Sequence, residues 1–271
     1  MKLYWKLNKS RWVLVAGGLA TLLCLAVLAV YRRQMPPWQL GLTLVLAAGV
    51  CLGATWFAAG MVASACQQSM LEQLHLKLQP DAFVAAYAPV AEAMPPDSAG
   101  AVTAAVNLAD GYCAAGDWQQ ALATLVQPSA QLAEPKRSAF QALVLRSRCR
   151  YCLWGGEVPG AEAALQTFAR QVESLRESNP PLAENLQGDV ELYQTWLGLL
   201  TGHTADCGVL EQKMQQLPTK LAKLDVCWML LLASRAARDE AAEKRYESLF
   251  RQEGGNLAAA RTLRGAKAAE G

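Results

Sequence analysis

The first 66 residues of the chain contain no acidic side chain, although 23 aspartates and glutamates follow them. Six of the 25 lysines and arginines lie in this segment, which therefore has a charge of +6 and leaves −4 for the remainder. The small positive net charge of the whole chain is thus a property of the N-terminal segment. A basic surface on the rest of the chain is not predicted, and neither is binding to nucleic acid.

Residues that carry catalysis are also scarce. His75 and His203 are the only histidines, so a serine or cysteine nucleophile has little choice of base. The chain has no Gly-x-Ser-x-Gly sequence, and Gly155-Gly156 lacks the Gly-Lys that completes a phosphate-binding loop. We therefore predict no catalytic residues, no cofactor and no enzymatic activity.

Eight cysteines occur at irregular spacing, which does not indicate a disulfide framework. Cys149 and Cys152 would share one face of a helix, where two thiols can bind a metal ion or form a redox pair. A structural zinc ion needs four ligands, and no second pair of cysteines or nearby histidine supplies the rest. We interpret both thiols as small residues packed between helices, and predict no metal site.

Two long stretches lack charge, namely the 20 residues Trp12–Tyr31 and the 29 residues Trp38–Cys66. About 20 apolar residues in a helix cross the hydrocarbon core of a bilayer. We predict a membrane anchor over residues 1–66, a hairpin of two transmembrane helices at about 12–31 and 38–63. A cleaved signal peptide and a buried core helix are the alternatives for the first and second stretch respectively.

The distribution of basic residues predicts how this hairpin is oriented. Four lysines and arginines precede the first stretch, Arg32 and Arg33 lie between the two, and Lys77 follows the second. Placing both ends in the cytoplasm gives five positive charges inside and two outside, in agreement with the positive-inside rule. We therefore expect a two-pass protein of the cell membrane, with the N-terminus and the rest of the chain cytoplasmic.

The remainder of the chain is predicted to be all-α, because no stretch alternates apolar and polar residues in the manner of a strand. Prolines and glycines divide it into short helices with tight connections, which makes consecutive helices antiparallel neighbours. We expect a helical connector over residues 67–97, helix pairs over 98–252, and a C-terminal helix or tail over 253–271. These breaks fall at Pro80, Pro95-Pro96, Gly116-Asp117, Pro128, Pro135, Gly155-Gly156, Pro180-Pro181, Gly202, Pro218, Arg238-Asp239 and Gly254-Gly255.

Residues 107–122 resemble the middle of a tetratricopeptide repeat. Leu108, Ala109 and Tyr112 occupy the large, small and aromatic positions of its first helix, Gly116-Asp117-Trp118 matches its turn, and Ala121 its second helix. Weaker units follow at residues 148–165, 194–210 and 226–249, at spacings longer than the roughly 34 residues of that family. The resemblance implies an irregular α-solenoid of antiparallel helix pairs, in which first helices line a concave groove.

The same resemblance gives candidate partner-binding residues on that groove. On the first unit it places Asp110, with Val106 and Cys113 beside it; on the second, the spacing i, i+4, i+8 puts Arg146, Arg150 and Trp154 on one face. Weaker candidates for the same groove are Trp196 on the third unit and Asp225, Trp228 and Arg235 on the fourth. We expect this stripe to bind an acidic or C-terminal peptide segment. The alternative is a solvated arginine pair, with Trp154 packed under the next helix.

Two functions follow from these expectations. The first is a membrane-anchored helical-repeat protein that mediates protein–protein interaction, as a scaffold or by recruiting a protein or peptide partner to the bilayer. The alternative is an accessory subunit of a larger membrane complex, such as a transport or secretion assembly. In that case Gly41, Gly49, Gly53 and Gly60 would form a helix-packing face, because small residues let backbones approach closely.

Overall fold

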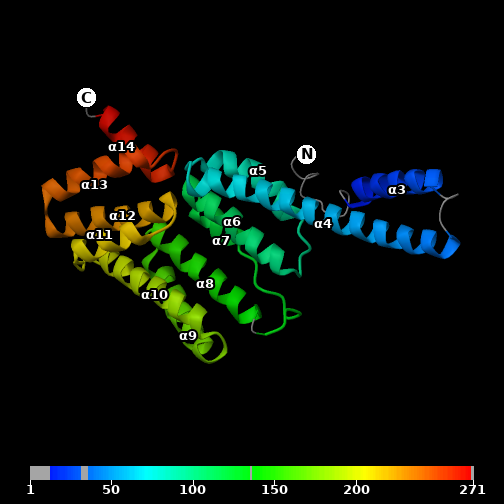
Figure 1. Cartoon of the computed structure of the whole chain (residues 1–271). Coiled ribbons are helices and arrows are strands. Elements are labelled where there is room, and N and C mark those ends of the chain that lie inside the picture. The colour runs from blue at the N-terminus through cyan, green and yellow to red at the C-terminus, as the bar shows by residue number, and fades with distance from the viewer. Residues whose placement is uncertain (1–12, 32–35, 135, 270–271) are drawn as a thin grey trace. The chain divides into compact units, whose positions relative to one another are not determined.

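The structure, a computed structural model, describes residues 13–31, 36–134 and 136–269, and this part of the chain is helical without strands. The all-α prediction is therefore confirmed for these residues (Figure 1). Its helices are η1 (Val13–Gly17, a π-helix), α3 (Gly18–Tyr31), α4 (Pro37–His75), α5 (Pro80–Glu92), α6 (Ala99–Ala115), α7 (Trp118–Thr124), α8 (Lys136–Trp154), α9 (Val158–Ser178), α10 (Pro180–Leu200), α11 (Cys207–Gln216), α12 (Lys220–Ala237), α13 (Glu240–Glu253) and α14 (Ala258–Ala269).

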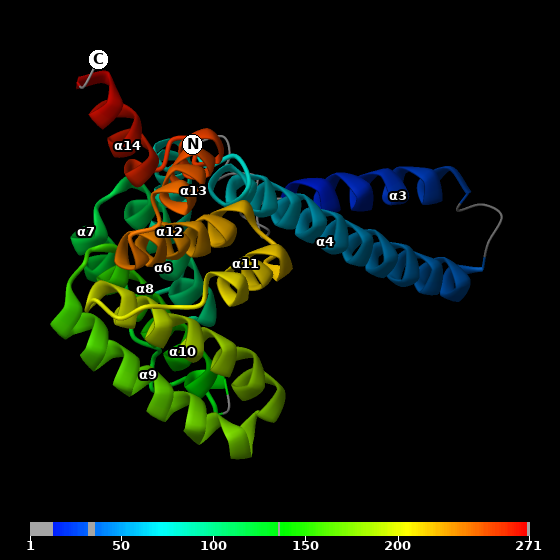
Figure 2. The same cartoon turned by 90° about the vertical axis from the view of Figure 1, so that its left-hand side faces the viewer.

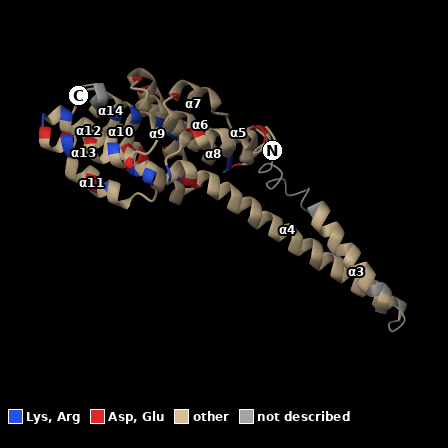
Figure 3. Ribbon diagram, turned by 90° about the horizontal axis from the view of Figure 1, so that it is seen from above, with Lys and Arg blue, Asp and Glu red and all other residues tan. Residues whose placement is uncertain are grey.

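The chain divides into two compact units, Met1–Met70 and Leu71–Gly271. One helix of the described residues, over Trp38–His75, is long and apolar enough to cross a membrane, and all but its last five residues belong to the first unit. The earlier apolar stretch forms η1 and the 14-residue helix α3, which is shorter than the 20-residue helix expected there. In Figure 3, α3 and most of α4 are coloured as uncharged residues. The basic residues before Trp12 and those between the stretches lie outside the described residues.

Helices α3 and α4 of the first unit lie against each other. A Cβ atom on Gly17, at the end of η1, would come within 2.7 Å of Leu52 Cδ2 on α4, so the two segments approach closely there. Further along the pair, the Sγ atoms of Cys24 and Cys51 are 3.7 Å apart. These contacts place two residues that are 27 positions apart in the sequence side by side.

The second unit begins with the last turn of α4. The helical connector expected over residues 67–97 is interrupted here, because α4 ends at His75 and Leu78 has a left-handed backbone, with φ of 53°. The amide of Gln79 then bonds to the Gln73 carbonyl, 2.9 Å away, which closes the helix end. Leu78 is 1% exposed, so burial of its side chain offsets the strain of this conformation.

Left-handed residues end the first helix in each of the four expected helix pairs. They are Gly116 with φ of 100°, Gly156 with 66°, Gly202 with 88° and Arg238 with 56°. Three of the positions are glycines, which adopt this conformation without steric cost, and the fourth unit uses an arginine instead. The predicted turn positions therefore coincide with helix ends.

Packing follows the chain order, with one departure. Helices α6, α8, α10 and α12 lie side by side in succession, and α7, α9 and α13 each pack against the helix that precedes them. In Figures 1 and 2, α9 lies at one side of the unit, with α8 and α10 between it and α12. The third unit is different: α10 packs mainly against α9, and α11 against α12, so these two helices do not form a close pair of their own.

Residues near the end of the second unit contact residues near its beginning. Asn256 donates its amide to the carbonyl of Leu78, 2.9 Å away. On α14, Arg261 Nη1 lies 2.8 Å from Asp81 Oδ2 on α5, and Nη2 donates to the Ala115 carbonyl at 3.1 Å. The helices of this unit thus close on themselves instead of ending as an open array (Figure 1).

A glycine substitution tests this closure. A Cβ on Gly116 would lie 2.7 Å from the Cβ of Ala258 on α14, whereas one on Gly156 meets nothing within 4 Å. Both Gly116→Ala and Gly156→Ala carry the strain of a left-handed alanine, about 1–2 kcal/mol. We expect Gly116→Ala to lower the free energy of unfolding further, measured by chemical unfolding of the detergent-solubilised chain followed by circular dichroism. Adding Ala258→Gly should restore part of the loss; no recovery would contradict the contact.

Candidate functional site

Arg150 on α8 is the centre of a charged network inside the second unit. Its Nε and Nη2 atoms donate to Asp225 Oδ2 and Oδ1 on α12, at 2.7 and 3.0 Å, and Nη1 donates to Asp110 Oδ1 on α6 at 2.9 Å. The three side chains are 12%, 13% and 18% exposed respectively. One guanidinium therefore holds together helices that are 40 and 75 residues distant in sequence.

Two further donors complete the network. Trp154 Nε1 lies 2.9 Å from Asp225 Oδ1, and the Tyr151 hydroxyl lies 2.9 Å from Asp110 Oδ1. Burial, together with the neighbouring Asp110 carboxylate, raises the pKa of Tyr151 well above its ordinary value, so its hydroxyl remains a proton donor. Each aspartate thus accepts hydrogen bonds from the arginine and from one uncharged donor.

Arg146, one turn earlier on α8, pairs with a different helix. Its Nε atom lies 2.8 Å from Asp189 Oδ2 on α10, as an ion pair without the alignment of a hydrogen bond. The two side chains are 41% and 24% exposed, so this pair is more open to solvent than the Arg150 network. Successive turns of α8 therefore tie it to α10 and to α6 and α12.

Aromatic rings continue the same face of α8. The ring centroid of Trp154 lies 5.3 Å from that of Trp196 in an edge-to-face arrangement, and 5.6 Å from that of Trp228, which it stacks on. Phe250 of α13 lies 5.6 Å from Trp228. Trp196 is fully buried, and its Nε1 has no hydrogen-bond partner among the described residues. This aromatic cluster of Trp154, Trp196, Trp228 and Phe250 forms an apolar support beneath the charges.

A central cavity of about 450 Å³ lies beside these ion pairs. Helices α6, α8, α10 and α12 all contribute to its wall, as do the end of α4 and the segment before α12. Its apolar lining includes Val106, Leu143, Leu192 and Leu217. Its polar lining consists of His75, Thr103, Asn107, Asp110, Arg146, Ser147, Arg150, Asp189, Tyr193, Thr219 and Asp225.

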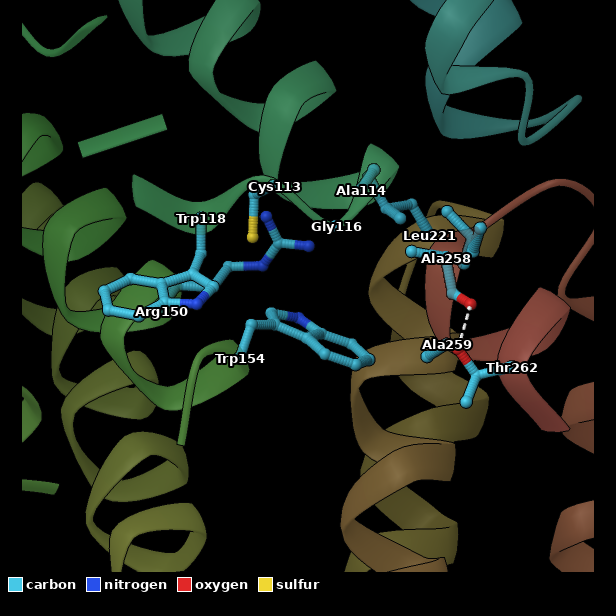
Figure 4. A pocket seen from close by; sticks show the side chains of 11 residues that line it. Cys113, Ala114, Gly116, Trp118, Arg150, Trp154, Leu221, Ala258, Ala259 and Thr262 are labelled. Carbon is cyan, nitrogen blue, oxygen red and sulfur yellow. Dashed lines mark hydrogen bonds between the residues drawn. The ribbon is translucent and has the colours of Figure 1, made fainter. Parts of the chain in front are cut away.

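A smaller side cavity of about 150 Å³ lies on the other side of Arg150. Figure 4 shows the Arg150 side chain extending between Cys113 and Trp154, with Ala258 and Thr262 of α14 across the space. Its walls are mostly apolar, and α14 forms one of them. The last helix, which contacts the start of the unit, therefore also supplies one wall of this cavity.

The structure brings most of the expected groove residues together. Asp110, Arg146 and Arg150 line the central cavity, as does Val106, while Cys113 and Trp154 line the side cavity. Two other residues of that set, Trp196 and Trp228, belong to the aromatic cluster. Arg235 does not join them, because its Nε pairs with Glu243 Oε1 on α13, 2.8 Å away.

These positions change what the arginines can do. Arg150 is neither solvated nor free for the carboxylate of a partner, because the chain's own Asp110 and Asp225 occupy its three nitrogens. Trp154 packs against the rings of α10 and α12, as the alternative interpretation of the stripe described. The groove thus carries internal ion pairs where the sequence suggested an unpaired basic stripe.

Sequence reasoning missed several residues of the cavity wall. Asp189 and Tyr193 lie seven and three positions before Trp196, so helical spacing from that tryptophan was a signal that could have found them. His75 gave no such signal, because it follows a long apolar helix and precedes the predicted repeats. Its place in the wall depends on a contact between distant parts of the chain.

The pair Cys149 and Cys152 is buried between α8 and α9. Cys149 Sγ lies 3.9 Å from the Ala161 carbonyl, and neither residue is more than 3% exposed. Among the described residues, no three His, Cys, Asp or Glu side chains are placed to hold a metal ion. The positions fit the packing interpretation made from the sequence.

Thiol modification tests this interpretation. Burial raises the pKa of Cys149 to about 12, so almost no reactive thiolate is present at mildly alkaline pH. We expect iodoacetamide to leave Cys149 unmodified in the native protein, as read by mass spectrometry, and to modify it after unfolding. Cys207, half-buried at the start of α11, is the reference thiol and should react first. Faster reaction of Cys149 than of Cys207 would speak for a redox site.

Comparison with protein-family models, curated proteins and solved structures finds no match to this chain. Function therefore has to be inferred from the central cavity, the charges around it and the apolar helix that precedes them.

Proposed function

We propose that the chain is a membrane-anchored helical-repeat protein that binds a segment of a partner protein in its central cavity and keeps it at the bilayer. The observation that carries the proposal is the cavity itself, of about 450 Å³, with charged and apolar walls supplied by the alternate helices α6, α8, α10 and α12. Its volume is within the range of roughly 300–1,000 Å³ typical of binding pockets. Left-handed residues after α6, α8, α10 and α12 supply the tight connections that an array of helix pairs would need.

The membrane anchor determines where the bound partner is held. In the proposal α3 and α4 both cross the membrane, and the basic residues at the N-terminus place the helical unit in the cytoplasm. Confinement to a surface raises the effective concentration of a bound partner near other membrane proteins. The partner is then recruited to the bilayer without any chemical change to the segment that is bound.

Photo-crosslinking in native membranes tests the proposal. A photoreactive amino acid at Leu192, in the cavity wall, is compared with one at Gln194, which is exposed on the same helix. We expect covalent adducts with a protein of defined mass from position 192 and far fewer from position 194. Equal yields at both positions, or none at 192, would contradict binding in the cavity.

Oxidative crosslinking tests the hairpin. Because the Sγ atoms of Cys24 and Cys51 are 3.7 Å apart, a mild oxidant should join them readily. We expect an intramolecular disulfide between these residues in membranes, detected by mass spectrometry after digestion, and its loss in Cys24→Ala. Crosslinks formed only between two copies of the chain would show that α3 does not fold back on α4.

An accessory subunit of a larger membrane complex is the second candidate. Within the described residues, Cβ atoms on Gly41, Gly49 or Gly53 of α4 would meet nothing within 4 Å, which leaves this small-residue face open. Another helix could approach closely there. Replacing Gly49 and Gly53 together by isoleucine should then remove a co-purifying membrane partner, whereas Gly18→Ile, which also adds a side chain in open space on α3, should not.

A further inference from the structure

The charges around the central cavity do not balance. Its wall contains three carboxylates, from Asp110, Asp189 and Asp225, and two guanidiniums, from Arg146 and Arg150. His75 is also in the wall, and a histidine is mostly neutral at physiological pH, since its usual pKa is about 6.5. The wall therefore has one negative charge in excess.

The hydrogen bonds show which carboxylate oxygens of the wall are still able to accept a donor. Both oxygens of Asp225 already accept from Arg150, and one of them also from Trp154. Asp110 uses only Oδ1, and Asp189 only Oδ2, so the second oxygen of each accepts no hydrogen bond from the described residues. Since both residues line the cavity, these two oxygens can accept hydrogen bonds from an occupant.

The rest of the wall suits a long side chain with a charged end. Val106, Leu143 and Leu192 offer apolar contact for methylene groups. Lysine and arginine combine such a stem with a charged head, which requires a carboxylate when it leaves water. An anionic group would instead depend on Arg146, because Arg150 is held by two aspartates.

We propose that the central cavity binds the cationic side chain of a lysine or arginine, with Asp110 and Asp189 as the accepting carboxylates. This inference rests on the proposed function, because it names the chemistry of the segment that the cavity holds. It also reverses the charge expected of the partner: the sequence alone suggested an acidic segment, whereas the paired arginines and the excess carboxylate favour a basic one.

The test measures binding of three acetylated, amidated pentapeptides of sequence Ala-Ala-X-Ala-Ala to the full chain in detergent, by tryptophan fluorescence. X is lysine, glutamate or norleucine, so charge changes at similar length. We expect the lysine peptide to bind at least about tenfold more tightly than the other two. Asp189→Asn should remove that preference. Glu191→Gln, which removes an exposed carboxylate from the same helix, should leave it unchanged.

Preference for the glutamate peptide, equal affinity for all three, or no binding would each overturn the inference, and these results need no variant to fold. The photo-crosslinking at Leu192 separates this failure from that of the proposed function. Protein adducts without a lysine preference would leave the function standing and the charge assignment wrong. A lysine preference without adducts would mean that the cavity takes a small cationic molecule instead of a protein.

Discussion

Replacing Arg150 by methionine is expected to lower the free energy of unfolding of the helical unit by about 3–5 kcal/mol. The substitution keeps the length and much of the volume of the side chain but leaves Asp110 and Asp225 buried without their shared cation. Removing one partner of a buried ion pair costs more than the pair contributes, since the remaining charges stay desolvated. The measurement is chemical unfolding of the detergent-solubilised chain, followed by circular dichroism.

Arg148→Met is the matched control for this prediction. Arg148 is two positions away on the same helix and exposed, so the same chemical change should alter the unfolding free energy by less than about 0.5 kcal/mol. Arg150→Lys should fall between the two variants, because an ammonium cannot bond both aspartates with the fork of a guanidinium. Similar losses in Arg148→Met and Arg150→Met would show that the network does not hold the unit together.

The second large effect is expected at Trp196. Its side chain is fully buried, so Trp196→Ala should cost about 3–5 kcal/mol of unfolding free energy by leaving a cavity beneath Trp154. Chemical unfolding of the full chain again provides the measurement. A loss below about 1 kcal/mol would mean that α8, α10 and α12 do not meet around this ring.

Phenylalanine substitutions separate packing from hydrogen bonding within the aromatic cluster. Trp196 Nε1 has no partner among the described residues, so Trp196→Phe removes volume but no hydrogen bond. Trp154→Phe removes a similar volume and also the bond from Nε1 to Asp225. We expect Trp154→Phe to be the more destabilising of the two, by about 1.5–3 kcal/mol, the value of a hydrogen bond to a charged group. Equal losses would show that this bond contributes nothing.

Local features of this fold were predictable because they depend on neighbouring residues. Glycine and proline positions marked the helix ends, since the backbone limits of these residues act within a few positions. The spacing of Arg146, Arg150 and Trp154 predicted that they share a face of one helix, which the structure confirms. Helical class and turn positions followed from the same local rules.

What each residue contacts across the fold was not predictable in the same way. The partners of Arg150 are 40 and 75 positions distant, and nothing in a helical period indicates which aspartate will face an arginine. The contact of Arg261 with Asp81 joins two exposed charges 180 positions apart. The pairing of α10 with α9 also depends on tertiary packing. For these reasons the cavity wall, including His75, became visible only in three dimensions.

The hydrogen bond from Asn256 to Leu78 limits how the number of helices in this unit can change. An open array of helix pairs lengthens or shortens by whole units, because each unit touches only its neighbours. Here the last helix contacts the first, so an added pair would push Arg261 away from Asp81 and Ala115. We therefore expect changes of length that keep these contacts to fall in the loops and not to add whole helix pairs.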